Sequence, residues 1–282
     1  MPRQEERALL EAARSGDRRA LRRLLDRMSR PIYRFGRDFC RNPEDAEDVM
    51  QEVLASLVRS LPSLRGDASL TTWAYTVARN ACIRQRRRFG RAVVSLEGAA
   101  GGSSDGHRAP VRFAEGVLDP ERELLRSEVE TALRTGLASL PAAQRDAVLL
   151  RDVEGLPLGE VARVLRVGPR AAKARIHRGR AALRHALARL LREEDAVHPR
   201  PRGCPDVARL LSGYLEGDLD ASRCADLAAH VARCPSCGRE CRALRRSLGA
   251  CRRYGRRGLP ARVRDRLRRS IAAVLSGTDN SL

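Results

Sequence analysis

The most regular feature of this sequence is the spacing of its hydrophobic residues, which recur at steps of three and four along almost the whole chain. The clearest examples are Leu21, Leu24, Leu25, Met28, Ile32, Phe35 and Phe39, followed by Val49, Val53, Leu54, Leu57, Val58 and Leu61. Such spacing gathers apolar side chains on one face of an α-helix, so it predicts amphipathic helices. No stretch alternates with period two for long enough to indicate a strand, and aromatic residues make up only 3% of the chain. We therefore predict an all-α protein.

Two stretches rich in Gly, Pro and Ser interrupt the helical pattern: GAAGGSSDGHRAP at 98–110 and HPRPRG at 198–203. Such compositions are typical of connectors between folded units. A chain of 282 residues is long enough for two or three such units. In chain order we predict these parts: unit 1–90, linker 91–120, unit 121–195, linker 196–203, unit 204–254 and tail 255–282.

The net charge of +20, with 55 Lys and Arg against 35 Asp and Glu, indicates a polyanionic partner such as DNA. Codon bias is an alternative explanation, because Lys173 is the only lysine. That bias explains the use of arginine in place of lysine better than it explains the excess of cations.

The charged N-terminus lacks the apolar core of a signal peptide, and no run of 18 uncharged apolar residues occurs. We therefore expect a cytoplasmic protein without a membrane partner. No clustered general acid, base or nucleophile indicates catalysis, so we do not expect an enzyme.

In the first unit, the segment NPEDAEDVMQEVLASL at 42–57 carries the signals of a helix start. Asn42 is the expected N-cap, Pro43 the first helical residue, and two acids follow in the first turn. Three polar residues share the exposed face of this helix: Asp48, Gln51 and Glu52. An ordinary solvated face explains this stripe as well as a binding site does.

The segment RGDASLTTWAYTVARNACIRQRRRFGR at 65–91 predicts a second helix with Thr71 or Thr72 as its cap. Its inward residues are expected to be Trp73, Val77 and Ala81. Its outward residues suit DNA, since Asn can pair with adenine and Arg can bind phosphate; they are Arg79, Asn80, Arg84, Arg86, Arg87 and Arg88. A merely solvated basic helix is the alternative.

The second unit contains LGEVARVL, the short turn RVG and a helix beginning near Pro169, which is the spacing of a helix-turn-helix. The second helix carries almost no acid and suits a major groove; its cationic residues are Arg170, Lys173, Arg175, His177, Arg178 and Arg180. Response regulators and many repressors share this pattern.

The third unit contains HVARCPSC at 230–237, which resembles a metal knuckle. His230 and Cys234 share a helix face, Cys237 follows after a short turn, and Cys204 offers a fourth ligand for tetrahedral Zn²⁺. Cys224 and Cys241 are rival candidates. About 50 residues enclose little apolar area, and a structural zinc supplies about 10–16 kcal/mol of apparent binding energy. We therefore expect a structural zinc.

The remaining cysteines leave a redox role open. Cys241 and Cys251 lie near the knuckle, where oxidation could eject zinc and release an inhibited state. A purely structural zinc with idle cysteines is the alternative. Cys40 and Cys82 are expected to stand alone as small buried hydrophobic residues.

The order NPEDAEDVMQEVLASL, RGDASLTTWAYTVARN and a basic run resembles region 2 of the extracytoplasmic-function (ECF) sigma factors of bacterial RNA polymerase. The helix-turn-helix segment resembles sigma region 4. The resemblance implies that Asp48, Gln51 and Glu52 bind core RNA polymerase and that the first basic helix faces the −10 element. It also implies that the second helix of the helix-turn-helix reads the −35 element. Three positions depart from the family pattern: Arg166 stands where a glycine commonly makes the turn, Arg170-Ala171 replaces Gly-Thr, and Gly168 is a weaker cap.

The stretch CPDVARLLSGYLEGDLDASRCADLAAHVARCPSCGREC is similar to the zinc-binding anti-sigma domain. The resemblance implies a built-in module that contacts the two sigma units within the same chain and controls access to them. The basic helix at 259–275 has Val263, Leu267, Ile271 and Val274 on one side; it is expected to dock on the sigma units or to act as a membrane-surface or DNA-binding tail. We predict a sigma factor with a fused regulatory domain. The alternative is a free-standing helix-turn-helix regulator that senses zinc or redox state.

Overall fold

The computed structural model describes residues 3–40, 43–64, 69–96, 120–190, 202–255 and 261–277. These ranges contain twelve α-helices, two short helical turns and no strand, which confirms the all-α prediction. Within them, no helix combines the length and the apolar character needed to cross a membrane. The two predicted linkers lie largely outside the described residues.

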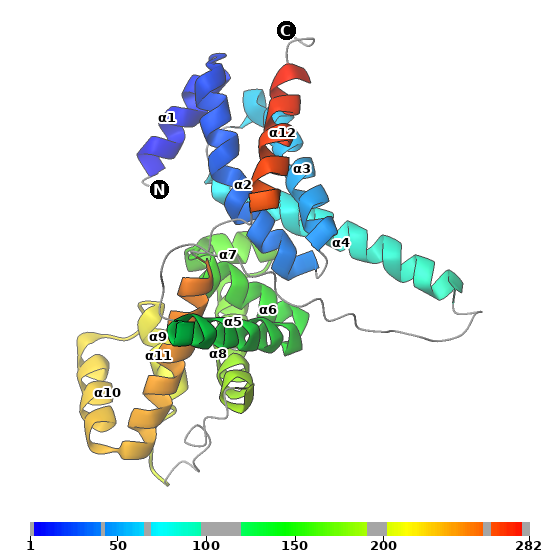
Figure 1. Ribbon diagram of the computed structural model, residues 1–282. Helices are drawn as coiled ribbons and strands as arrows, with labels where there is room; N and C mark the ends of the chain where they lie inside the picture. Colours follow the sequence, from blue (N-terminus) through cyan, green and yellow to red (C-terminus); the bar gives the residue numbers. More distant parts are fainter. Residues whose placement is uncertain are drawn as a thin grey trace.

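The first unit is a bundle built around α2. Its elements are α1 (Arg3–Arg14), α2 (Arg18–Cys40), α3 (Pro43–Ser60), the 3₁₀ turn η1 (Leu61–Ser63) and α4 (Leu70–Leu96). α2 packs against α1, α3 and α4 through large buried side chains such as Leu25, Ile32 and Phe35. Figure 1 shows α4 extending well beyond the rest of this bundle.

The cap of α4 differs from the prediction. The Oγ atom of Ser69 accepts a hydrogen bond from the backbone N–H of Thr72 at 3.1 Å. Ser69 is therefore the N-cap, because a cap must lie outside the helix and α4 already begins at Leu70. The expected cap of α3, Asn42, lies outside the described residues.

The second unit consists of α5 (Pro120–Ser139), α6 (Ala142–Val148), the π-helical turn η2 (Leu149–Val153), α7 (Leu158–Leu165) and α8 (Pro169–Leu190). α7 and α8 form the predicted helix-turn-helix. Arg166 ends α7 in the left-handed conformation, with φ 53° and ψ 49°. An L-residue in this conformation costs roughly 1–2 kcal/mol, and Arg166 adopts it at the position where the resembled family commonly has a glycine.

The C-terminal unit, residues 202–255 and 261–277, contains α9 (Val207–Leu215), α10 (Ala221–Arg233), α11 (Pro235–Gly255) and α12 (Ala261–Gly277). Helices α9 to α11 enclose a small core around Val207, Leu211 and Leu244. α12 is separate from this core and lies alongside α2 and α3 (Figure 1).

Hydrophobic clusters cross the unit boundaries. The core of the first unit continues into Leu150 and Ile176 of the second unit and into Leu267 of α12. The core of the second unit includes Cys251 and Tyr254 of α11. Helices α11 and α12 are therefore built into the cores of the units that precede them.

Cys40 and Cys82 do not stand alone. Both side chains are buried, as predicted, but they form a disulfide whose Cα atoms are 5.3 Å apart. The packing of α2 against α4 brings together two cysteines that are 42 residues apart in sequence.

Candidate functional sites

One face of α8 is matched by acidic residues of the C-terminal unit. The basic residues on this face, one helical turn apart, are Lys173, His177, Arg180 and Arg184. Lys173 pairs with Asp218, Arg180 with Glu216 at 2.9 Å, and Arg184 with Glu240 at 2.9 Å. The C-terminal unit therefore covers this side of the predicted DNA-recognition helix with opposite charge.

Arg180 was predicted to face a major groove, and this is wrong. Its side chain is only 3% exposed. It donates two hydrogen bonds to Asp152, at 2.9 and 2.6 Å, and others to Glu216 and to Ser212 Oγ at 2.8 Å. A buried guanidinium needs several acceptors, and these residues satisfy it. Arg180 joins the two units and does not face solvent.

The turn after α9 makes this contact possible. Gly217 has a φ of 75°, in the region that favours glycine, and it separates Glu216 from Asp218. Glu216 also accepts a hydrogen bond from Arg151 at 3.0 Å and is 1% exposed. The short turn thus places two carboxylates against three cations of the second unit.

The other predicted DNA-binding residues of α8 lie differently. Arg170 and Arg178 are exposed, and Arg175 is half-buried. His177 is half-buried close to Asp206; burial lowers its pKa, whereas the charge of Asp206 raises it. Of the five predicted residues, Lys173 and His177 therefore face the C-terminal unit.

On α4, the predicted DNA-binding residues also make contacts within the chain. Arg79 lies 4.0 Å from Asp146 of α6 and is 19% exposed, and Asn80 is half-buried. Arg84 forms an ion pair with Glu52 of α3. Residues predicted to bind two different partners, DNA and polymerase, thus neutralise each other. The side chain of Arg87 lies outside the described part of α4.

The predicted polymerase-binding residues Asp48, Gln51 and Glu52 are all exposed on α3. α12 lies beside them. Its Arg266 pairs with Glu47, and its apolar residues Val263, Leu267 and Ile271 are at most 5% exposed against the first unit. The tail therefore docks on the first unit, one of the two outcomes predicted for it. The side chain of Val274 is outside the described residues.

Two carboxylates of the second unit bind the first unit directly, and sequence patterns gave no signal for them. Glu154 accepts two hydrogen bonds from Arg34, at 2.8 and 2.6 Å, and one from the Tyr75 hydroxyl at 2.6 Å. Glu160 of α7 accepts hydrogen bonds from the hydroxyls of Ser69 and Thr72 at 2.9 and 2.7 Å. The helix-turn-helix is thus fastened to the start of α4.

Tyr254 fastens the end of α11 to the end of α2. Its hydroxyl donates a hydrogen bond to Asp38 and accepts one from Arg37, whose guanidinium carbon lies 5.3 Å from the ring centroid. Burial raises the pKa of Tyr254, so the phenol stays protonated and keeps its donor.

The four predicted metal ligands lie together. The ligand atoms of Cys204, His230, Cys234 and Cys237 are all within 4.8 Å of one another. The sulfur atoms of Cys204 and Cys234 are 3.8 Å apart, which matches the edge of about 3.8 Å expected for a tetrahedron with Zn–S bonds of about 2.3 Å. His230 Nε2 is buried without a hydrogen-bond partner. These features fit a tetrahedral metal ion.

The rival cysteines are placed elsewhere. Cys224 has its sulfur near the Leu219 carbonyl, 3.9 Å away, and Cys241 is buried in the small core of α9 to α11. Cys251 is fully buried against the second unit, and burial raises the pKa of its thiol, which disfavours the reactive thiolate.

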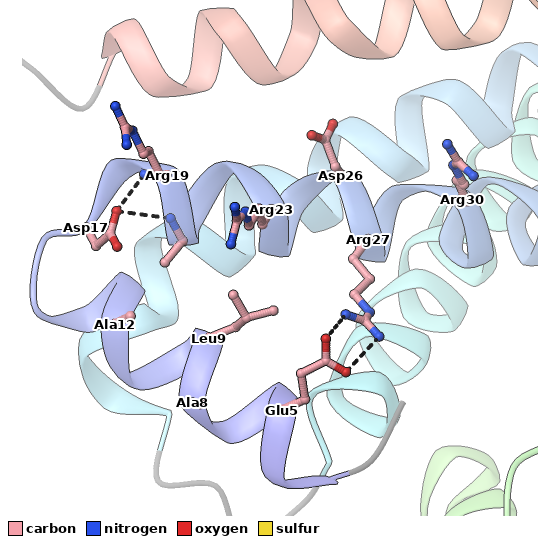
Figure 2. A pocket seen from close by; sticks show the side chains of 11 residues that line it. Glu5, Ala8, Leu9, Ala12, Asp17, Arg19, Arg23, Asp26, Arg27 and Arg30 are labelled. Carbon is pink, nitrogen blue, oxygen red and sulfur yellow. Dashed lines mark hydrogen bonds and ion pairs between the residues drawn. The ribbon is translucent and has the colours of Figure 1, made fainter.

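A surface hollow of about 990 Å³ lies between α1 and α2 (Figure 2). Arginines and carboxylates alternate around it, and Arg27 is already paired with Glu5 at 2.9 Å. Its charges nearly balance, so the hollow has no strong preference for an anion or a cation.

Comparison with protein families gives three matches along the chain. Residues 24–92 match the profile of Sigma-70 region 2, and residues 130–183 match that of Sigma-70, region 4. Residues 204–238 match the family described as "Putative zinc-finger".

Individual relatives agree with these matches. The RNA polymerase sigma-H factor of Pseudomonas aeruginosa is 30% identical over 194 residues, which cover 67% of this chain and 97% of that protein. The ECF RNA polymerase sigma factor SigM of Mycobacterium tuberculosis is 33% identical over 184 residues, covering 65% and 83%.

Among solved structures, CnrH in complex with the cytosolic domain of CnrY has 23% identity and a TM-score of 0.47, covering 66% of this chain and 98% of that one. The sigma factor RpoE in complex with the anti-sigma factor NepR from Bartonella quintana has 23% identity and a TM-score of 0.42, covering 67% and 95%. On the strength of its sigma relatives, matched over nearly their full length, the chain belongs to the ECF sigma factor family of RNA polymerase, with a zinc-finger-family domain fused to its C-terminal side.

Proposed function

We propose that this sigma factor is held in a closed, inactive form by its own C-terminal unit. A sigma factor is a non-enzymatic initiation factor. The alternative of a free-standing regulator gives way to the family assignment. The single observation that carries the proposal is the match between the cationic face of α8 and the carboxylates of Glu216, Asp218 and Glu240.

The two DNA-reading units must separate for promoter binding. Elements centred at −10 and −35 are about 25 base pairs apart, which is roughly 85 Å of duplex at about 3.4 Å per base pair. In the closed form, Ser69 at the start of α4 lies 2.9 Å from Glu160 of α7. Both units cannot reach their elements in this arrangement.

The C-terminal unit stabilises the closed form at both ends. α9 and α11 contact the second unit, while α12 contacts the first. The C-terminal unit therefore contacts both sigma units. Opening to the spacing of the promoter elements must break at least one of these contacts, because the five residues that join α11 to α12 reach only about 20 Å when fully extended.

The exposed residues of α3 are proposed to meet core polymerase. Asp48, Gln51 and Glu52 remain exposed, but α12 is docked immediately beside them through Arg266 and Glu47. A helix with its side chains is about 10–12 Å across. α12 therefore sterically prevents a partner as large as polymerase from binding to the surface of α2 and α3.

The DNA-binding residues are proposed to be Arg79, Asn80, Arg84 and Arg87 on α4, and Arg170, Lys173, Arg175, His177 and Arg178 on α8. Most of these side chains that the structure describes are engaged within the chain or half-buried. Cationic residues that pair with carboxylates can pair with phosphates, since both are oxygen anions. Opening of the closed form would transfer these cationic residues from the carboxylates of the chain to the phosphates of DNA.

The metal is proposed to be a structural Zn²⁺ held by Cys204, His230, Cys234 and Cys237. Two or more thiolates with one imidazole are ligands that zinc prefers, and four protein ligands leave no open position for catalysis. The backbone N–H of Cys237 lowers the pKa of the Cys234 thiol, which favours the thiolate that binds metal. The ion would join α10 and α11 to the segment before α9. Like its sigma relatives, the protein is proposed to work where polymerase is, in the cytoplasm.

Run-off transcription with core polymerase tests the proposal. The full chain is compared with a chain ending at residue 197 and with Arg266→Glu, which removes the pair with Glu47. Both are expected to give more transcript than the full chain. Arg268→Glu is the matched control, because Arg268 is exposed on the other side of α12 and its ion pair among the described residues is with Asp265 of the same helix. Equal output from the full and shortened chains would contradict inhibition in cis.

A further inference from the structure

The disulfide between Cys40 and Cys82 lies outside the metal cluster and has no place in the function proposed above. Cys40 is the last residue of α2 and is 6% exposed, while Cys82 in α4 is fully buried. The bond closes a covalent loop that contains all of α3 and the first half of α4. Arg79 and Asn80 lie within one turn of Cys82.

We propose that Cys40 and Cys82 form a reversible redox site that sets how firmly the C-terminal unit is docked. This inference rests on the proposed closed form. The oxidised pair strengthens docking, and the reduced pair weakens it. The site takes a peroxide or a low-molecular-weight disulfide as its oxidant.

The reason lies in the last turn of α2. Arg37 and Asp38 form the seat of Tyr254, the residue that fastens α11 to the first unit, and Cys40 follows two residues later. The last turn of a helix has carbonyl groups without intrahelical partners, so it frays unless something holds it. The bond to Cys82 holds this turn against α4, which is anchored in the core through Ala78 and Ala81.

Reduction removes that covalent tie but leaves a foldable site. The two thiols would be small hydrophobic side chains in an apolar core beside Phe39. The last turn of α2 would then be held by packing alone, and Tyr254 would lose the rigidity of its seat. The first unit stays folded while the docking of α11 weakens.

The chemistry balances with hydrogen peroxide as oxidant. The sulfur of Cys40, the more exposed of the two, attacks a peroxide oxygen and becomes a sulfenic acid as one water leaves. The sulfur of Cys82 then displaces the hydroxyl group, so that the S–S bond forms and a second water leaves. The two thiols have lost two protons and two electrons. A dithiol reductant returns them by thiol–disulfide exchange.

Polymerase works in a reducing compartment, where a protein disulfide is usually transient and either catalytic or redox-sensing. The other described cysteines are free thiols in this structure. Three of them form the metal cluster with His230, and Cys224, Cys241 and Cys251 have no disulfide partner. The redox function considered for Cys241 and Cys251 is therefore better placed at Cys40 and Cys82.

Thiol labelling followed by hydrogen exchange tests the inference on the full chain. After denaturation with a chelator, an alkylating reagent is expected to label six cysteines of the oxidised protein, and all eight after treatment with a phosphine reductant. In the native protein, the same reductant should accelerate amide exchange at 250–254 of α11 severalfold. The zinc thiolates are already reduced, so a reductant acts on the disulfide alone.

Cys40→Ala is the control, because it removes the bond and keeps the buried Cys82 thiol. Its amide exchange at 250–254 should be fast and insensitive to reductant. Cys82→Ala removes the same bond and should behave in the same way, so it replaces Cys40→Ala in the test if that variant folds poorly. Eight labelled cysteines before reduction would overturn the inference, as would equal exchange of the oxidised and reduced protein. Failure of the closed form would instead appear as equal transcription from the full and shortened chains, with the labelling result unaffected.

Discussion

Arg180 of the recognition helix and Glu216 of the turn after α9 lie 2.9 Å apart, and both side chains are at most 3% exposed. A charge buried to this extent is tolerated only with a partner, so each residue depends on the other. This pair joins the DNA-reading unit to the C-terminal unit at the centre of a longer charged contact.

The edge of that contact provides the first prediction. Asp218→Asn should strengthen binding of a fluorescently labelled DNA duplex, because it frees Lys173 without disturbing the buried pair. Freeing one phosphate contact should also steepen the slope of log affinity against log salt by about 0.9. Fluorescence anisotropy at several salt concentrations measures both.

Asp226→Asn is the matched control, since Asp226 is an exposed acid of α10 and the same charge is lost there. An equal gain from both variants would mean that only net charge matters and that Asp218 does not mask α8.

A second prediction concerns the close approach of α11 to η2. A Cβ atom at Gly255 would lie 2.1 Å from the Val153 carbonyl oxygen, so Gly255→Ala must push the end of α11 away. Such overpacking costs about 1–3 kcal/mol. The variant should therefore unfold at a lower temperature and give more transcript than the wild type.

Gly249→Ala tests the same substitution in the same helix. Its Cβ would meet only the flexible end of Arg253 at 3.3 Å. Since alanine favours helix interiors by roughly 0.5–1 kcal/mol, this variant should be as stable as the wild type or more so. An equal loss of stability in both variants would show that the effect of Gly255→Ala does not come from the close approach to Val153.

Acidic pH should loosen the docked form. Burial lowers the pKa of His177 below its ordinary value of 6.5, despite the opposing charge of Asp206. The folded form thus prefers neutral imidazole, and the unfolded or undocked form binds the proton more readily. Stability contributed by this group is present above pH 6.5 and is lost as the pH falls below it.

The measurement is the unfolding temperature at pH 7.5 and pH 5.5 for the wild type and for His177→Gln. Metal binding also weakens in acid, so the difference between the two proteins isolates His177. The fall in unfolding temperature should be smaller in His177→Gln. An identical fall would show that His177 makes no contribution.

Metal removal should unfold α9, α10 and the first part of α11. Their core is small, and a structural zinc contributes about 10–16 kcal/mol of apparent binding energy in small domains. A chelator, or Cys237→Ser, should therefore reduce helicity by circular dichroism and raise transcription. Cys224→Ala should retain one zinc per chain, because Cys224 is outside the cluster of four. Zinc loss in Cys224→Ala would instead assign it as a ligand.

The turn of the helix-turn-helix provides the last prediction. Arg166→Gly should stabilise the protein by about 1 kcal/mol, since glycine adopts the left-handed conformation without a steric penalty. The same change at the exposed residue Arg163, inside α7, should destabilise it by about 0.8–1 kcal/mol. Thermal unfolding measures both changes. The unfolding temperature should rise in Arg166→Gly and fall in Arg163→Gly.

Local patterns in the sequence were sufficient for much of this protein. Helical periodicity predicted the all-α fold and the helix-turn-helix, and the spacing of His230, Cys234 and Cys237 predicted three ligands of one cluster. These features depend on residues a few positions apart, whose relative placement is fixed by the geometry of one helix or turn. The left-handed turn at Arg166 was indicated instead by the resemblance to sigma region 4, in which a glycine commonly stands at this position.

The tertiary structure alone decided which charged side chains are exposed to a partner and which are paired within the chain. In the sequence, Arg178 and Arg180 belong to the same run of basic residues, yet Arg178 is exposed in the folded chain, whereas Arg180 is buried against carboxylates of its own unit and of the C-terminal unit. The pairing of Arg84 with Glu52 and the bond between Cys40 and Cys82 likewise join distant segments. Such contacts arise from how whole helices pack, and no short-range pattern encodes them.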